Sequence, residues 1–151
     1  MKLIACFDEC VNEWLDLYSQ EAMSGNSDSM IIYAKLLMRG SKSFECDIKQ
    51  ALYWLKEACK HNPEAALILG KIYCKGKYVH KDIEKAFFYL KLATLFKCKC
   101  GKLREQYHNN LITNVHPCFP DEAGKEIVKL SISEDTMRKF EEDFKIWRSS
   151  L

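Results

Sequence analysis

Residues 65–94 read AALILGKIYCKGKYVHKDIEKAFFYLKLAT, and residues 29–59 read SMIIYAKLLMRGSKSFECDIKQALYWLKEAC. Both stretches contain an apolar run at helical spacing, a loop that starts with glycine, an aspartate and a second apolar run. Gly76 and Asp82 match Gly40 and Asp47, at offsets of 36 and 35 residues. A helix pair repeated with a period in the mid-thirties is typical of an α-solenoid. We therefore expect an all-α fold built from stacked helical hairpins.

Local signals in each copy support helical hairpins. Asp82 stands where a second helix would begin, and an aspartate at that position can cap the free backbone N–H groups of the first turn. Asp47 precedes Gln50 by three residues, which is the signature of a capping box. Ala86 and Ala93 are seven residues apart, so they lie on one helix face and allow a close helix–helix contact.

The pattern of the second copy resembles the Sel1-like repeat, a relative of the tetratricopeptide repeat. The resemblance rests on Ala65, Leu69-Gly70, Tyr73, Gly76, Val79, Asp82, Lys85-Ala86, Tyr89 and Ala93. The chain departs from the family pattern at Tyr78, where a second loop glycine is usual, and at Tyr33-Ala34 in place of the Leu-Gly pair. The resemblance covers residues 11–97. It implies a short right-handed solenoid that binds other proteins and carries no catalytic residues.

This reading divides a single domain, residues 1–151, into four parts. Residues 1–28 form an N-terminal half-repeat with a helix from Phe7 to Met23, residues 29–62 form repeat one, and residues 63–97 form repeat two. Residues 98–151 form C-terminal capping helices, expected at 99–112, from Asp121 to Leu130 and from Ser133 to Trp147. The last of these carries Phe140, Phe144 and Trp147 as an apolar stripe. The alternative is that this tail folds back into the solenoid groove.

Basic residues recur at equivalent positions of the two copies. Lys35 and Arg39 lie one turn apart on the first helix of repeat one, and Lys71 and Lys75 follow 36 residues later. The resemblance implies that first helices line the concave face, so this ladder of four cations, with Tyr78 in the nearby loop, predicts a surface for an acidic protein partner. The competing interpretation is an ordinary solvated helix face.

The charge distribution raises one alternative function. The net charge is only +2, but residues 71–104 contain ten cationic side chains and two carboxylates. Such a segment could bind nucleic acid, with Tyr73, Tyr78 and Tyr89 available for base stacking. Tyr73 and Tyr89 fall on core positions of the repeat, however, which leaves only Tyr78 for stacking. The sequence therefore favours a protein partner over nucleic acid.

The cysteines and histidines suggest one possible metal site. Cys98, Cys100, His116 and Cys118 are ligand types that zinc prefers, but their C-x-C and H-x-C spacings are tighter than those of common zinc sites. We therefore expect no metal and no cofactor. The short run Leu3-Ile4-Ala5 does not resemble a signal peptide, and no stretch is long enough to span a membrane. The eight cysteines are accordingly expected to be reduced thiols of a cytoplasmic protein.

The sequence contains no catalytic motif. No nucleophile elbow, zinc-protease motif or phosphate-binding loop occurs, and the histidines share no spacing with a nucleophile or a carboxylate pair. We expect a protein–protein interaction module without enzymatic activity, small-molecule substrate or membrane association. It would act as an adaptor or regulator, or as a dedicated inhibitor such as an immunity protein that neutralises a toxin. The sequence does not identify the partner.

Overall fold

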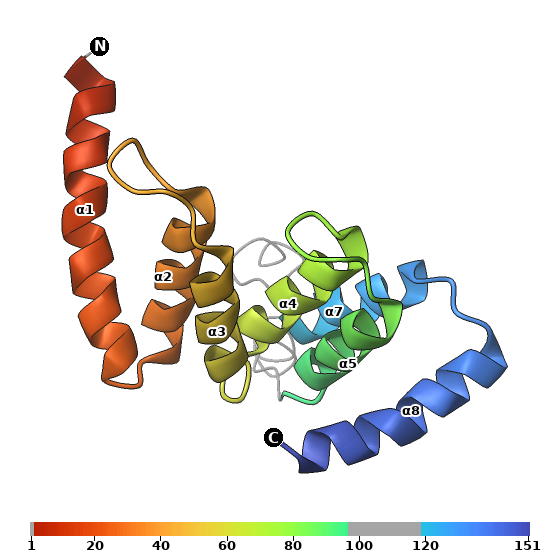
Figure 1. The fold of residues 1–151 in the computed structure, drawn as a ribbon. Coiled ribbons are helices and arrows are strands. Elements are labelled where there is room, and N and C mark those ends of the chain that lie inside the picture. The colour runs from red at the N-terminus through yellow and green to blue at the C-terminus, as the bar shows by residue number, and fades with distance from the viewer. Residues whose placement is uncertain (1, 97–118) are drawn as a thin grey trace, which may run out of the picture. The chain divides into compact units, whose positions relative to one another are not determined.

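The structure, a computed structural model, describes residues 2–96 and 119–151, and side chains from residue 10 onward. These residues form helices and no strand (Figure 1), which confirms the predicted all-α class. The helices are α1 (Lys2–Met23), α2 (Ser27–Arg39), α3 (Ile48–Ala58), α4 (Pro63–Lys75), α5 (Ile83–Thr94), α7 (Phe119–Lys129) and α8 (Glu134–Ser149). The predicted helix at 99–112 lies outside the described residues.

The chain divides into two compact units, Met1–Ala66 and Leu67–Leu151, and the boundary falls inside α4. In the first unit, α1 packs against α2, and α2 packs against α3. Ile31, Ala34, Ala51, Leu55 and Ala58 are almost or completely inaccessible to solvent. Small side chains at Ala34, Ala51 and Ala58 let the helices of the first hairpin come close together.

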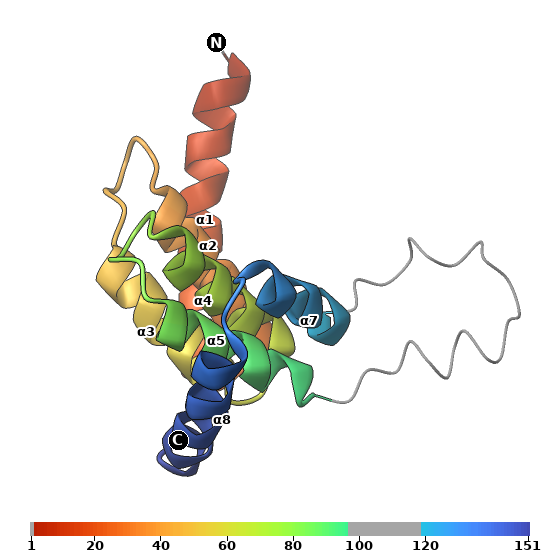
Figure 2. The same cartoon turned by 90° about the vertical axis from the view of Figure 1, so that its right-hand side faces the viewer.

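In the second unit, α4 and α5 form the hairpin of the other copy. A Cβ atom added to Gly70 on α4 would lie 2.6 Å from Cδ2 of Leu90 on α5, so only glycine fits at this crossing. The rings of Tyr73 and Tyr89 stack with centroids 5.6 Å apart. Both α7 and α8 pack against α5, on different sides of it (Figure 1 and Figure 2).

Hydrogen bonds confirm the predicted starts of α3, α5 and α8. The carboxylate of Asp47 accepts a bond from the backbone N–H of Gln50 at 3.0 Å, and that of Asp82 accepts one from Lys85 at 3.0 Å. The reciprocal bond of a capping box at Asp47 does not form, because the N–H of Asp47 donates to the carbonyl of Leu37. Ser133 caps α8 by accepting from the N–H of Thr136. Each of these caps satisfies a backbone donor that has no partner within its own helix.

Two helix starts differ from the sequence prediction, and two helix ends also shift, α7 ending at Lys129 and α8 at Ser149. Helix α1 begins at Lys2, five residues before the predicted Phe7. Helix α7 begins at Phe119, so Asp121 lies within its first turn and does not cap it. Pro120 tolerates this position because the first helical N–H groups have no intrahelical acceptor. A carboxylate within the first turn is also favourable, because the positive end of the helix dipole lies there.

Two helical glycines give a matched test of the α4–α5 contact. We expect Gly70→Ala to lower the free energy of unfolding by about 1–3 kcal/mol, because its methyl group would displace the fully buried Leu90. Gly124→Ala on α7 meets no atom within 4 Å, so it should raise the free energy by up to about 1 kcal/mol through helix propensity alone. Thermal and urea unfolding of both variants would measure the difference, and equal effects would contradict the close contact.

Candidate protein-binding surface

The five predicted binding residues belong to different units. Lys35 and Arg39 lie on α2 in the first unit, whereas Lys71 and Lys75 lie on α4 and Tyr78 lies in the following loop, all in the second unit. All except Lys71 are exposed, and Lys71 is partly covered.

Two of the four predicted cations, Lys35 and Lys71, form ion pairs within the chain. The ammonium of Lys35 donates to the carboxylate of Glu64, in the first turn of α4, at 2.6 Å. The ammonium of Lys71 donates in the same way to Glu122, in the first turn of α7. Helix α7 therefore meets Lys71 as the start of α4 meets Lys35. Because water still reaches both partners of each pair, each pair contributes no more than about 1 kcal/mol.

Sequence reasoning missed both ion pairs. A signal for them exists in the sequence, because a proline and a nearby glutamate occur in Pro63-Glu64 and again in Pro120-Asp121-Glu122. The partners are separated by 29 and 51 residues, and no pattern along the chain shows that they meet. The pairs reduce the positive charge that Lys35 and Lys71 offer to another molecule.

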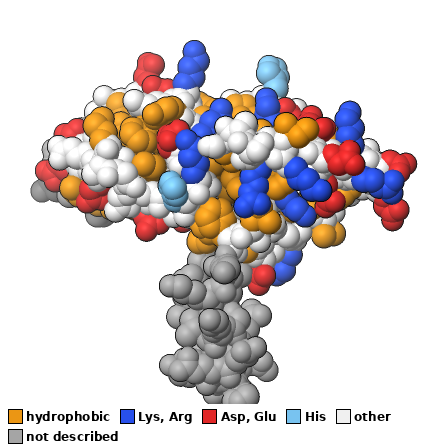
Figure 3. All heavy atoms as spheres, turned by 90° about the horizontal axis from the view of Figure 1, so that it is seen from below, with side chains coloured by type: hydrophobic (Ala, Val, Ile, Leu, Met, Phe, Trp, Pro, Cys, Tyr) orange, Lys and Arg blue, Asp and Glu red, His pale blue; other side chains and the backbone are white. Residues whose placement is uncertain are grey.

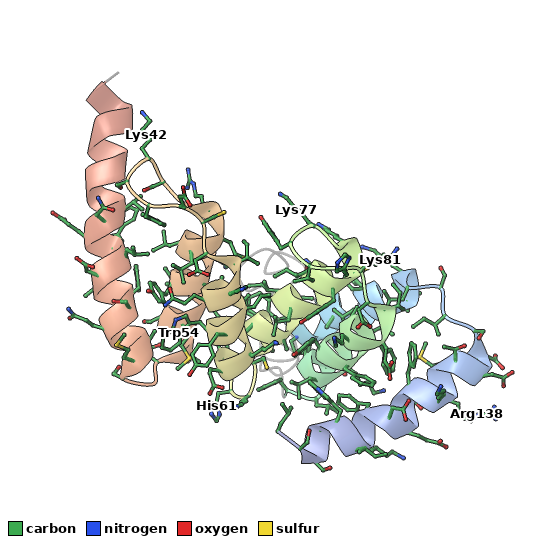
Figure 4. All side chains as sticks on the ribbon, in the orientation of Figure 1. Lys42, Trp54, His61, Lys77, Lys81 and Arg138 are labelled. Atoms are coloured by element: carbon green, nitrogen blue, oxygen red, sulfur yellow. The ribbon has the colours of Figure 1, made fainter. Side chains whose placement is uncertain are left out.

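Lys75, the last residue of α4, belongs to a group of exposed lysines that continues into the following loop. Lys75, Lys77, Lys81, Tyr78 and His80 are exposed, and we call residues 75–81 the basic loop. Figure 4 shows Lys77 and Lys81 on this loop between α4 and α5. Among the described residues, no carboxylate pairs with the ammonium of Lys75, Lys77 or Lys81. The nearest carboxylate along the chain, Asp82, instead caps α5 and pairs with Lys85 at 3.3 Å.

The backbone holds the basic loop at both ends. Gly76 has a left-handed φ of 67° and donates its N–H to the carbonyl of Ile72. The N–H of Asp82 donates to the carbonyl of Tyr73 at 3.1 Å, which closes the loop onto α4. A hollow of about 350 Å³ is lined by residues 76–81. The ammonium of Lys77 lies 5.2 Å from the ring centre of Tyr78, over an exposed aromatic face.

The tyrosines bear on the nucleic-acid alternative. Tyr73 and Tyr89 are buried and stack on each other, so neither ring offers a free face to a base. Tyr78 is exposed. Of the three tyrosines in this segment, only Tyr78 could therefore stack on a base.

A comparison with protein families matches the Sel1 repeat to residues 27–62 and 63–95. Residues 27–95 therefore contain two Sel1 repeats, which together span slightly less than half of the chain. A comparison with curated proteins finds no match. The repeats coincide with α2–α3 and α4–α5, and helices α1, α7 and α8 lie outside the matched residues. Sel1 repeats generally mediate protein–protein interactions and form a non-catalytic module, which fits the expected class of function.

The metal-site candidate Cys98, Cys100, His116 and Cys118 lies outside the described residues. Among the described side chains, those of residues 10–96 and 119–151, no group of three or more His, Cys, Asp or Glu residues is arranged to hold a metal ion. The helices of this described part also include none that is long and apolar enough to cross a membrane.

Cys59, at the end of the first Sel1 repeat, is a buried free thiol. It donates a hydrogen bond to the carbonyl of Lys56 at 3.0 Å. Burial is the main cause that raises the pKa of this thiol to about 11. A thiol that keeps its proton near neutral pH is a poor nucleophile and a poor metal ligand, so Cys59 packs as a small core residue.

The raised pKa of Cys59 predicts a dependence of stability on pH. The folded thiol holds its proton more tightly than the unfolded one, so this contribution is complete below about pH 9 and is lost as the pH rises through about 11. The loss should reach about 2–3 kcal/mol. Urea unfolding of the wild type and of Cys59→Ala at several pH values would isolate this effect from other titrations. The gap between the two proteins should shrink as the pH rises, and a constant gap would contradict the assignment.

Proposed function

We propose that this Sel1-repeat protein binds an acidic segment of another protein through the basic loop. The observation that carries the proposal is the group of three lysines, Lys75, Lys77 and Lys81, without carboxylate partners among the described residues. The ammonium of Lys77 lies over the exposed ring of Tyr78, 5.2 Å from its centre. Positive charge beside an aromatic ring suits a partner with carboxylates next to apolar side chains, because charge guides association and ring burial stabilises the complex.

The remaining ladder residues have a supporting role in this proposal. Lys35 and Lys71 are held by exposed ion pairs with Glu64 and Glu122, and a partner carboxylate can replace an intramolecular one at little cost. Arg39 is the counterpart of Lys75 in the first repeat. We propose that these three cations contribute less to binding than the basic loop does.

We further propose that the protein acts without catalysis, in the cytoplasm. Two kinds of work fit a small interaction module. One is an adaptor or regulator that joins a larger assembly. The other is an inhibitor, such as an immunity protein, that blocks a toxin. The two differ in outcome once the partner is purified, because an inhibitor abolishes its partner's activity at equal molar amounts whereas an adaptor leaves it unchanged.

Charge reversal of the basic loop tests the proposed surface. The variant Lys75→Glu/Lys81→Glu should lose binding by tenfold or more, since like charges across an interface cost on the order of several kcal/mol. Its thermal stability should stay within about 0.5 kcal/mol of the wild type, because both side chains are exposed. The partner would be captured from the native host, identified by mass spectrometry, purified and titrated by calorimetry. Wild-type affinity should also fall as salt rises.

Lys49→Glu is the control, because Lys49 is an exposed lysine on α3 of the first unit, whereas the basic loop belongs to the second unit. This control should bind as the wild type does. If the double variant folds and binds with unchanged affinity, the basic loop is not the interface. A fluorescently labelled single-stranded oligonucleotide tests the alternative function. Tight binding that the same reversal abolishes would favour nucleic acid over an acidic protein.

A further inference from the structure

The C-terminal helix α8 is attached to α5 by one aromatic stripe. Its three members, Phe140, Phe144 and Trp147, stand at helical spacing on one side of α8. The ring of Trp147 lies 5.5 Å from that of Phe88 and 5.2 Å from that of Tyr89, centre to centre. Phe144 lies 6.0 Å from Phe88. These contacts bury Phe144 almost completely.

The first repeat shows what α5 would look like without α8. Tyr53 on α3 occupies the position of Phe88 on α5, 35 residues earlier. Tyr53 is 57% exposed, whereas Phe88 is 7% exposed. The second repeat therefore has an aromatic surface on α5 that would be exposed to water by itself. Helix α8 packs on this surface and buries it.

Outside the aromatic stripe, the surface of α8 is mostly charged and exposed to solvent. Glu134, Asp135, Arg138, Lys139, Glu142, Lys145 and Arg148 are all exposed. The face of the molecule in Figure 3 likewise shows acidic and basic side chains interspersed among hydrophobic ones. One exposed ion pair, between Lys91 and Glu141 at 3.4 Å, accompanies the stripe. Helix α8 thus binds α5 as a separate amphipathic helix would bind a groove.

The connection from α7 to α8 is short and locally strained. Helix α7 ends at Lys129 and α8 begins at Glu134. Between them, Ser131 has a φ of 51° and is the one non-glycine residue with positive φ in the described part of the chain. A residue with a Cβ is disfavoured in this left-handed conformation, and glycine is the usual residue at such a helix end.

The connection lacks the residues that break helices, and becoming helical would cost it only the N-cap that Ser133 places on α8. No glycine or proline occurs in residues 125–151. In a continuous helix, Leu130, Met137 and Phe144 would follow one another at seven-residue intervals, beside Phe140 and Trp147 at the same interval. A straightened connection would therefore form helical hydrogen bonds, keep an apolar stripe and relieve the strain at Ser131.

We propose that α8 is exchanged between two copies of this chain. In the resulting dimer, α7 and α8 form one helix, and the stripe of each copy covers α5 of the other. The contacts are those already made within one chain, so a second copy fits the surface by construction. Short hinges under strain favour such an exchange. This inference is independent of the acidic partner.

Opposite substitutions at Ser131 test the hinge. The mass of the full-length protein would be measured by light scattering over a wide concentration range, after refolding at each concentration. The wild type should show a dimer that grows with concentration. Ser131→Gly should weaken dimerisation by about tenfold or more, because glycine accepts the left-handed conformation and disfavours the continuous helix. Ser131→Ala should strengthen it by roughly fivefold, because alanine favours the helix.

Crosslinking distinguishes exchange from other dimers. Isotopically light and heavy chains would be refolded together and treated with a carbodiimide, which can join Lys91 to Glu141 as an amide. Exchange predicts that about half of the Lys91–Glu141 peptide pairs from the dimer combine a light with a heavy peptide. If all pairs carry one label while dimer is present, the copies associate through another surface and the proposal is wrong. A monomer at every concentration, for Ser131→Ala as well, would also overturn it.

Discussion

The second repeat depends on the close approach of α4 and α5 at Gly70 and Leu90. A Cβ atom at Gly70 would force the buried side chain of Leu90 to shift, so the absence of this atom allows the two helices to approach this closely. This spacing brings Tyr73 and Tyr89 into a stack. The N–H of Asp82 donates to the carbonyl of Tyr73 and closes the basic loop, as the N–H of Asp47 closes the equivalent loop of the first repeat onto Leu37. The proposed binding surface therefore lies on a loop that the repeat itself holds closed.

The lysines on the first helices of the repeats differ in their surroundings, because some form ion pairs within the chain and Lys75 does not do so among the described residues. Lys35 and Lys71 bind glutamates at the start of the next helix, Glu64 and Glu122. Such pairs add little stability when exposed, but their recurrence shows that α7 follows the second repeat as α4 follows the first. Lys75, one turn further along α4, has no carboxylate partner among the described residues and stands at the edge of the basic loop. One turn of helix thus separates a structural lysine from a candidate binding lysine.

The tail covers α5 rather than leaving a bare end. Terminal units of a solenoid must present a polar outer face, since no further repeat covers them. Helix α8 does this with aromatic residues toward α5 and charged residues outward. A cover attached through a single stripe and a strained hinge has the properties of a removable element. This is the physical basis for exchange between copies.

The sequence alone determined the helical class, the two repeats and most helix boundaries, because these depend on short-range physics. Apolar spacing, a capping aspartate or serine, and a glycine after the helix act within a few residues, and Asp47, Asp82 and Ser133 cap as expected. The sequence could also mark a basic segment, but not which of its lysines already have partners. Glu64 and Glu122 reach Lys35 and Lys71 only after the chain folds. Tertiary structure also decided that Phe88 is covered while Tyr53 is exposed. The two residues have similar local sequences, and only a distant helix, packed by nonlocal contacts, distinguishes them.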